Sequence, residues 1–214
     1  MTSSADKRID SVYHSASREQ LAKTYDDWAS GYDADMHSTG YIHPAIIVGL
    51  VARYVKDSAA AILDAGVGTG TIGQLLSILG YTNLLGIDMS EGMLTKARSR
   101  NIYTDLRQGI LGESLDFKTA SIDCIVSTGT FTTGHAPASS FDELVRITKP
   151  GGHLIFTVGT VVWDEAGFSA KLTALEKSGH LKKVDTTEAY HPMPLSKTES
   201  GFTTRALTYL RIYT

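Results

Sequence analysis

The chain has 214 residues, of which 42% are hydrophobic, so it is long enough to bury a substantial core as one compact unit. Its formal net charge is −3, and its 20 basic residues are scattered along the sequence, which argues against a nucleic-acid-binding surface. The single cysteine, Cys124, excludes an internal disulfide, and its apolar neighbours indicate a buried structural thiol.

The N-terminal segment is polar throughout. It lacks the apolar run of a signal peptide, and no later stretch approaches the roughly 20 apolar residues that cross a bilayer. These features predict a cytoplasmic protein that does not bind membranes. Residues 1–17 are polar and rich in serine, which predicts a flexible arm or a fraying helix start.

Residues 18–57 carry two helical patterns. The first spaces Leu21, Tyr25 and Trp28 four and three residues apart and is ended by a Ser-Gly pair. The second opens at Pro44, a residue tolerated in a first helical turn, and repeats its apolar positions along one face. We therefore expect two helices before the core of the domain.

From residue 58 to residue 159, short β-branched runs alternate with longer helical patterns. This alternation predicts a parallel sheet covered by helices on both faces, with its ligand at the carboxyl ends of the strands. The last two strand patterns, residues 180–191 and 203–214, follow each other in sequence. We expect them to form an antiparallel pair at the edge of the sheet.

The glycine-rich run at residues 64–73 has two possible readings. Its later glycines give G-x-G-x-x-G, the dinucleotide pattern, whereas a start at Asp64 gives D-x-G-x-G-x-G. Both readings place Asp88 at the end of the next strand, 18 residues after Gly70, where a ribose-binding acid belongs. The carboxylate of Asp64 discriminates between them, because it would repel a pyrophosphate but attract the sulfonium and ammonium groups of S-adenosylmethionine.

Three segments carry a wider resemblance: ILDAGVGTG (62–70), GIDMSEGML (86–94) and ELVRITKPGGHLIF (143–156). Together they resemble the motifs of class I S-adenosylmethionine-dependent methyltransferases. The resemblance implies an α/β, Rossmann-like fold with a seven-stranded, mostly parallel sheet, an antiparallel C-terminal strand and helices on both faces. It also divides the chain into the flexible arm, a lid of N-terminal helices at residues 18–57, and a methyltransferase core at residues 58–214.

A narrower resemblance rests on YDDWASGYDADM (25–36) and STGTFTTGHAP (127–137). These segments are most similar to the branch that includes the methyltransferase-like protein of the Williams-Beuren region. That branch is defined largely by sequence, so the similarity implies no particular substrate.

The family resemblance also implies a cofactor site for S-adenosylmethionine. Asp64 would orient the amino group of the cofactor, directly or through water, Asp88 would accept hydrogen bonds from the ribose, and Met89 would lie against the adenine. Many relatives carry an acid after the glycine of the third motif, where this chain has Ile110, so backbone atoms are expected to serve there. The implied cofactor-binding residues are Tyr25, Trp28, Tyr32, Asp64, Ala65, Gly66, Gly68, Gly70, Asp88, Met89, Gly109, Ile110, Leu111 and Ser127.

The aromatic residues Tyr25, Trp28 and Tyr32 have two interpretations. They pack the first helix onto the sheet, or they also form part of the lid over the methionine end of the cofactor, where π-density and exclusion of water favour a sulfonium.

The expected reaction is methyl transfer to a small-molecule acceptor by in-line displacement, for which alignment in a dry site supplies much of the rate. A base is needed only for a protonated, weak nucleophile, and His135 is the candidate for that role, the alternative being a histidine that caps its loop or faces solvent. An acceptor pocket is expected between the loop of His135, residues 163–168 and the lid, with Phe131, Trp163 and Phe168 in its wall. No metal site is expected, and we expect a monomer or weak homodimer.

The sequence is also compatible with two other functions. The glycines alone also fit an NAD(P)-dependent oxidoreductase, and the same fold can serve as a non-catalytic S-adenosylmethionine-binding or partner protein.

Overall fold

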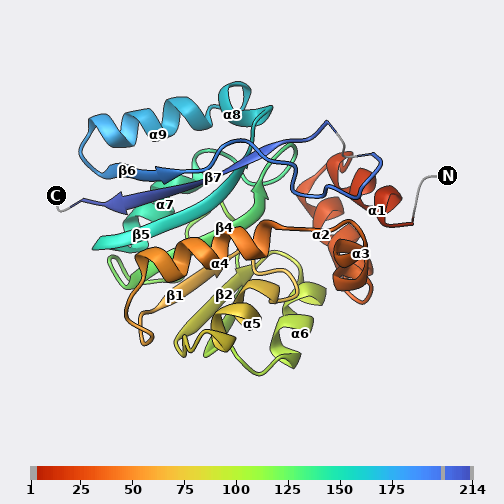
Figure 1. Ribbon diagram of the computed structural model, residues 1–214, viewed down its shortest axis with the longest axis horizontal. Helices are drawn as coiled ribbons and strands as arrows, with labels where there is room; N and C mark the ends of the chain where they lie inside the picture. Colours follow the sequence, from red (N-terminus) through yellow and green to blue (C-terminus); the bar gives the residue numbers. More distant parts are fainter. Residues whose placement is uncertain (1–3, 199–200, 213–214) are drawn as a thin grey trace.

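The computed structural model describes residues 4–198 and 201–212, and its centre is a seven-stranded sheet (Figure 1). The strands are β1 (Ile62–Ala65), β2 (Leu84–Asp88), β3 (Asp105–Gln108), β4 (Ile122–Phe131), β5 (Thr148–Gly159), β6 (Leu181–Thr186) and β7 (Thr204–Arg211). Their order in the sheet is β3-β2-β1-β4-β5-β7-β6. Strands β1 to β5 pair in parallel, whereas β7 is antiparallel to both β5 and β6. The expected fold, including the antiparallel C-terminal strand, is confirmed.

The helices of the described residues are α1 (Ser4–Tyr13), α2 (Arg18–Trp28), α3 (Tyr32–Ser38), α4 (His43–Tyr54), α5 (Thr71–Ile78), α6 (Glu91–Ser99), α7 (Ser140–Ile147), α8 (Val162–Glu165) and α9 (Phe168–Lys177). Helix α2 begins at an N-cap, Ser17, whose side chain accepts a hydrogen bond from the backbone N–H of Gln20. Pro44 occupies the first turn of α4, as its position in the sequence predicts.

Helices cover both faces of the sheet, and each strand divides its side chains between them. Leu63 and Ile125 belong to the core that includes residues of α7 and α9. Their neighbours Ile62 and Cys124 belong to the core that includes residues of α4 and α5. This alternation follows from the two-residue period of a strand, and it buries the Cys124 thiol completely, as expected.

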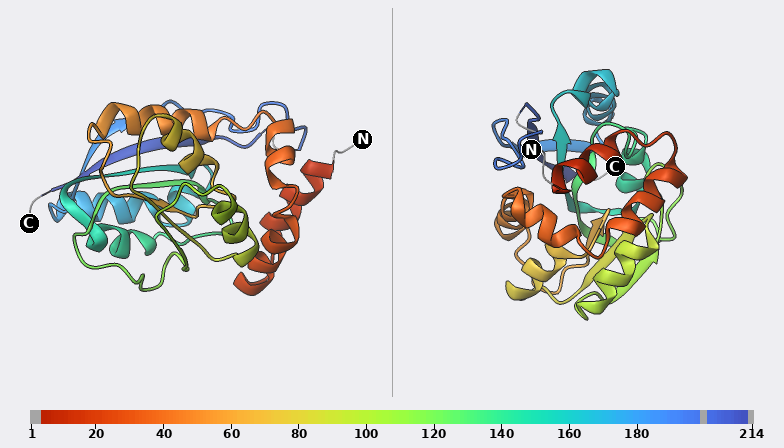
Figure 2. Two further views of the ribbon diagram at one scale, coloured as in Figure 1. Left: turned by 90° about the horizontal axis from the view of Figure 1, so that it is seen from below. Right: turned by 90° about the vertical axis from the view of Figure 1, so that its right-hand side faces the viewer.

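Parallel register brings the functional strand ends to one edge of the sheet. Asp64 of β1 lies opposite Gly86 of β2 and Val126 of β4. Helices α1, α2 and α3 gather at one end of the sheet, away from the end where the C-terminus lies (Figure 2).

The flexible arm expected at residues 1–17 is wrong for Ser4–Tyr13, which form α1. Ile9 and Val12 are only 3% and 4% exposed and pack with Leu21 and Trp28 of α2. A few apolar residues at helical spacing are enough to dock this helix, although the segment as a whole is polar. Residues 1–3 of the expected arm and residues 213–214 of the expected last strand lie outside the described residues.

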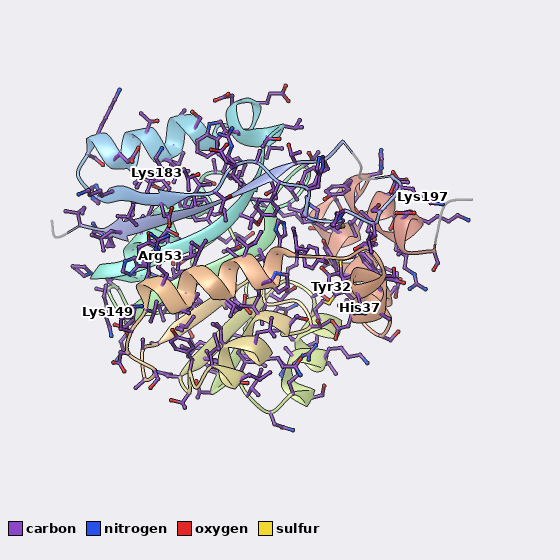
Figure 3. The ribbon with its side chains drawn as sticks, viewed as in Figure 1. Tyr32, His37, Arg53, Lys149, Lys183 and Lys197 are labelled. Carbon is purple, nitrogen blue, oxygen red and sulfur yellow. The ribbon has the colours of Figure 1, made fainter. Side chains whose placement is uncertain are left out.

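The labelled cations Arg53, Lys149, Lys183 and Lys197 come from separate parts of the chain, with Lys149 and Lys197 toward opposite ends of the view (Figure 3). Within the part of the chain that the structure describes, no helix is long and apolar enough to cross a membrane. The same residues contain no cluster of three or more His, Cys, Asp or Glu side chains that could hold a metal ion.

Candidate active site

The turn after β1 depends on glycine. Gly66, Gly68 and Gly70 have φ angles of 82°, 53° and 86°, in the left-handed region that favours glycine. A Cβ atom on Gly66 would lie 2.6 Å from the hydroxyl oxygen of Thr130, whereas one on Gly68 would meet nothing within 4 Å. The backbone of Gly68 is therefore open to a ligand, and Gly66 is required for packing against β4.

Asp88, at the end of β2, ties this turn to the start of α6. Its Oδ2 accepts a hydrogen bond from the N–H of Gly68 at 2.8 Å, and its Oδ1 accepts one from the N–H of Ser90 at 2.9 Å. Burial raises the pKa of Asp88 to about 6, while these N–H donors oppose the rise. At neutral pH the side chain is mainly a carboxylate, held in place to accept further hydrogen bonds.

Asp64 lies deeper, and only 2% of its surface is exposed. Its Oδ2 accepts a hydrogen bond from the Tyr103 hydroxyl at 3.0 Å, and its Oδ1 has no partner among the described residues. Burial raises the pKa of Asp64 to about 7, although the Tyr103 hydrogen bond lowers it. The buried, unpaired oxygen is free to accept a hydrogen bond from a ligand donor or a bridging water.

Tyr103 also explains the last glycine of the run. The N–H of Gly73 donates to the Tyr103 hydroxyl at 3.1 Å, and a Cβ atom on Gly73 would collide with that ring. Gly73 therefore makes room for a side chain of the protein, which is a different role from the one that the dinucleotide pattern assigns to it.

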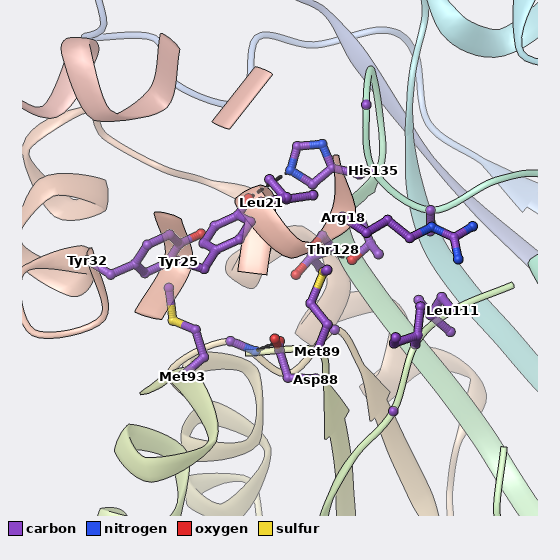
Figure 4. A pocket seen from close by; sticks show the side chains of 18 residues that line it. Arg18, Leu21, Tyr25, Tyr32, Asp88, Met89, Met93, Leu111, Thr128 and His135 are labelled. Atoms are coloured by element: carbon purple, nitrogen blue, oxygen red, sulfur yellow. Dashed lines mark hydrogen bonds between the residues drawn. The ribbon is translucent and has the colours of Figure 1, made fainter. Parts of the chain in front are cut away.

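A cleft opens at the carboxyl ends of β1, β2 and β4, beneath α2 (Figure 4). Its empty volume, which includes space open to solvent, is about 810 Å³. Most of the residues that the sequence predicts for the cofactor line it, namely Tyr25, Tyr32, Gly66, Gly68, Asp88, Met89, Gly109, Ile110 and Leu111. His135, predicted as the catalytic residue, lines the same cleft.

The other predicted residues are not among those that line the cleft: Trp28, Asp64, Ala65, Gly70 and Ser127. The indole N–H of Trp28 donates to Asp35 at 2.7 Å, so this ring packs within the N-terminal helices. The Ser127 hydroxyl donates to the backbone oxygen of Ala65 at 2.7 Å and joins β4 to β1. The side chains of these two residues support the site from behind.

Sequence reasoning missed Arg18, Leu21 and Met93 as cleft residues. Arg18 and Leu21 precede Tyr25 by seven and four residues in α2, so all three share one face of that helix. That spacing is the signal that could have found them once Tyr25 had been placed at the cofactor.

Two aspartates dock the N-terminal helices onto the core. Asp26 of α2 accepts hydrogen bonds at its Oδ1 from the Ser90 hydroxyl, at 2.5 Å, and from the N–H of Gly92, at 2.8 Å. Asp33 of α3 accepts hydrogen bonds from the Thr69 hydroxyl, at 2.5 Å, and from the Arg100 guanidinium, at 2.6 Å. Both attachments reach the rim of the cleft, at the start of α6 and at the glycine turn.

Tyr25 and His135 are joined across the cleft. The Tyr25 hydroxyl oxygen lies 2.8 Å from Nε2 of His135, and Nδ1 of the same ring lies 2.8 Å from the backbone oxygen of Thr133 (Figure 4). Burial lowers the pKa of His135, so its imidazole is neutral at pH 7. The pair is a neutral, hydrogen-bonded unit at the mouth of the candidate site.

A second cavity adjoins the cleft. Tyr25, Tyr32, Gly129 and His135 line both spaces. The second cavity is also lined by Ile9, Val12, Tyr13, Trp28, Met36, Tyr41, His43, Phe131, Thr132, Thr157, Gly159, Pro192, Met193, Phe202 and Thr204. Most of the side chains in its wall are apolar or aromatic, and hydroxyl and imidazole groups add polar surface to it. Helix α1 supplies part of this wall.

The three aromatic residues expected in the wall of an acceptor pocket do not share one cavity. Phe131 lines the second cavity, whereas Phe168 is 1% exposed and packs in the sheet core, and Trp163 packs against that core. In place of these two residues, α1 and Phe202 face the cavity. Sequence patterns could not show this, because α1 and Phe202 are brought together only by the folded chain.

Comparisons with known proteins agree with this geometry. Residues 63–156 match the family model described as a methyltransferase domain. Methyltransferase-like protein 27 from Homo sapiens is 33% identical over 162 residues, covering 72% of this chain and 65% of that protein. Malonyl-[acyl-carrier protein] O-methyltransferase from Marinomonas sp. is 29% identical over 143 residues, covering 65% of this chain and 52% of that protein.

A solved structure shows the same fold. It is the complex between a Haloferax volcanii methyltransferase and the Trm112 methyltransferase activator, with a TM-score of 0.66 and 20% identity, covering 88% of this chain and 98% of that one. The chain itself spans about half to two thirds of the length of the two relatives described above.

The sheet order, the glycine turn and the acid at the end of β2 define a Rossmann-like cofactor-binding domain. The chain is similar to the class I S-adenosylmethionine-dependent methyltransferases, with residues 63–156 matching a methyltransferase domain, and S-adenosylmethionine is the cofactor of that family. The residues present fit this cofactor, because Gly68 leaves open backbone, Asp88 presents a carboxylate to the cleft, and Asp64 retains an unpaired buried oxygen.

Proposed function

We propose that the protein transfers a methyl group from S-adenosylmethionine to a small-molecule acceptor. The observation that carries this proposal is the meeting of two cavities at Tyr25, Tyr32, Gly129 and His135. Methyl transfer is an in-line displacement, so it requires two ligands end to end in a site that excludes bulk water. The cleft takes the cofactor and the second cavity takes the acceptor.

The residue roles follow from this arrangement. Asp88 accepts hydrogen bonds from the ribose hydroxyls, and the open backbone of Gly68 allows close approach of the cofactor. Met89 and Ile110 lie on the adenine side of the cleft, and the unpaired oxygen of Asp64 receives the cofactor amino group, directly or through water. Bound there, the cofactor supplies an electrophilic methyl group.

The character of the second cavity supports a small acceptor. Its wall consists mainly of apolar and aromatic side chains from α1, β4 and the segment before β7. Such a wall favours a compact, partly apolar molecule. The relative from Marinomonas is named for a malonyl group on acyl carrier protein, and we propose a free small molecule for this chain because its cavity lies between α1 and the sheet.

Calorimetric titration with S-adenosylhomocysteine and with NAD⁺ tests the cofactor. We expect S-adenosylhomocysteine to bind, NAD⁺ not to bind, and Asp88→Ala to weaken S-adenosylhomocysteine binding more than tenfold. The matched control is Asp116→Ala, since the side chain of Asp116 is fully exposed and lies outside the cleft. Binding of NAD⁺ with no binding of S-adenosylhomocysteine would overturn the proposal.

Incubation with methyl-labelled cofactor and a metabolite extract tests the reaction. The label is expected in a small molecule, and the protein with Asp88→Ala is expected to transfer much less. Label found only in protein or nucleic acid would contradict a small-molecule acceptor.

A further inference from the structure

We propose that Tyr25 and His135 act together as the proton acceptor of this site, and that the acceptor is a phenol, an aromatic ring with a hydroxyl nucleophile. This inference rests on the proposed function, since it concerns the proton that must leave when the methyl group arrives. It assigns Tyr25 a chemical role that its position in a helix of the predicted lid does not suggest.

The direction of the hydrogen bonds follows from the partners of His135. The backbone oxygen of Thr133 can only accept, so Nδ1 of His135 must carry the ring proton. In a neutral imidazole, Nε2 is then the acceptor, and the Tyr25 hydroxyl must donate to it across 2.8 Å. The lone pairs of the Tyr25 oxygen remain available to a hydroxyl group of the acceptor.

The pair lies where the transfer would occur. Both side chains line the cofactor cleft and the second cavity, so they stand at the boundary between the two ligands. The ring of Tyr25 stacks on Trp28 with a centroid separation of 6.2 Å and an interplanar angle of 10°. The edge of Tyr13 contacts His135 at a centroid distance of 5.8 Å. These ring contacts orient both side chains before any ligand binds.

The groups that face His135 leave its imidazole neutral at rest, so that Nε2 is able to accept a proton. Its two hydrogen-bond partners are a carbonyl and a phenol, and the other titratable or charged side chains that line the cleft are Arg18, Tyr32 and Asp88. Tyr13 contacts the ring from α1. Burial raises the pKa of Tyr25 well above 10, so Tyr25 is protonated and relays a proton, and burial keeps His135 neutral.

The proton and the methyl group move in opposite directions across the acceptor oxygen. The acceptor hydroxyl gives its proton to the Tyr25 oxygen while Tyr25 gives its own proton to Nε2 of His135. The acceptor oxygen forms a bond to the methyl carbon, and the bond between that carbon and sulfur breaks with its electron pair left on sulfur. The products are an aryl methyl ether, S-adenosylhomocysteine and an imidazolium on His135, which releases its proton to solvent.

A base in the site benefits some nucleophiles more than others. A thiol, with an ordinary pKa of about 8.5, is partly ionised near neutral pH, whereas a phenol, with a pKa of about 10, is almost wholly protonated there. A neutral amine can attack before it loses a proton, so a phenol gains most from a placed base. The aromatic walls formed by Tyr13, Phe131 and Phe202 suit a flat ring.

The first experiment needs no acceptor. Nitrogen NMR of ¹⁵N-histidine-labelled protein at pH 7.5, with the His135 signal assigned through His135→Gln, reads the protonation of each ring nitrogen. We expect a neutral ring with the proton on Nδ1. A proton on Nε2 alone, or on both nitrogens, would overturn the inference.

The second experiment compares three acceptors with the same ring: 2-naphthol, 2-naphthylamine and naphthalene-2-thiol, each with methyl-labelled S-adenosylmethionine. We expect wild type to methylate 2-naphthol. His135→Gln is expected to lower kcat for it by about 10²-fold or more, with a smaller effect on the thiol. Tyr25→Phe is also expected to lower kcat for 2-naphthol. His180→Gln, which replaces a partly exposed histidine outside both cavities, is the control and should leave kcat within twofold.

Calorimetry measures S-adenosylhomocysteine binding by wild type and by each variant. It distinguishes failure of this inference from failure of the proposed function. Binding by His135→Gln within about threefold of wild type shows a folded cleft. A protein that binds S-adenosylhomocysteine yet methylates none of the three rings, prefers the amine, or keeps its 2-naphthol rate in both variants overturns the inference alone. Failure of wild type to bind S-adenosylhomocysteine overturns the proposed function itself.

Discussion

Tyr103 shows how much a single hydroxyl supports at this site. It donates to Asp64, accepts from the N–H of Gly73, and thereby joins β1 to the start of α5. No motif in the sequence marks this residue, because it follows α6 in the chain and reaches the glycine turn only in the folded protein.

Tyr103→Phe should therefore destabilise the protein. The change leaves the Asp64 carboxylate without its hydrogen-bond donor in a buried position, and such a loss costs about 1–3 kcal/mol. Chemical denaturation measures the change in the free energy of unfolding. Tyr54→Phe is the matched control, since the Tyr54 hydroxyl donates to Asp185 at 2.8 Å in a more exposed setting. Equal losses in the two variants would contradict a special role for Tyr103.

The pKa of Asp88 leads to a prediction of how cofactor affinity depends on pH. Burial raises the pKa of Asp88 to about 6, so the carboxylate that we propose as the acceptor of hydrogen bonds from the ribose is present above that pH and is lost below it. The affinity for S-adenosylhomocysteine should thus rise between pH 5 and pH 8. Calorimetry at half-unit intervals measures this slope.

Two other carboxylates bear on this slope. Asp26 faces Asp88 from α2 and helps raise its pKa, and the pKa of Asp64 is about 7. Asp88→Asn should remove the part of the slope near pH 6, and Asp64→Asn the part near pH 7. A slope unchanged in Asp88→Asn would show that Asp88 does not titrate against the ligand.

At the scale of elements, the sequence predicts the strands and helices whose residues are close together in the chain. The strands of the sheet and α4 follow from apolar periodicity, and Asp88 follows from its position after a strand. Helix α1 was missed because only a few apolar residues dock it, and Phe168 was misplaced because an aromatic residue does not reveal whether it faces a cavity or the core. Contacts between distant segments, such as that of Tyr25 with His135, cannot be read from spacing.

The attachment of α2 to α6 gives another prediction. Asp26 accepts hydrogen bonds from Ser90 and Gly92, so Asp26→Asn weakens the attachment of α2 at the cleft rim. We expect S-adenosylhomocysteine binding to weaken several-fold and proteolytic cleavage within residues 14–31 to become faster. Its neighbour Asp27 is exposed, and its ion-pair partner among the described residues is Lys23 of the same helix, so Asp27→Asn provides the control. Equal behaviour of the two variants would argue that α2 does not act as a lid.

At the scale of the whole molecule, the residues that line the cleft we propose for the cofactor come from only some of the elements. The cleft takes residues from α2 and α3, from the turns after β1 and β2, and from the loop after β4. Helix α9 and strand β6 supply none of the residues that line either cavity. Ligand binding should therefore order one end of the molecule.

Hydrogen exchange with and without saturating S-adenosylhomocysteine tests this division. We expect slower exchange at residues 18–36, 66–70, 88–93 and 109–111, because the ligand joins the N-terminal helices to the core. Residues 168–186 should change little, apart from positions that exchange only by global unfolding. There, a ligand at 100 times its Kd adds about 2.7 kcal/mol to the free energy of opening. Protection spread evenly over both regions would mean that the ligand stabilises the domain only as a whole, and would remove the evidence for a lid.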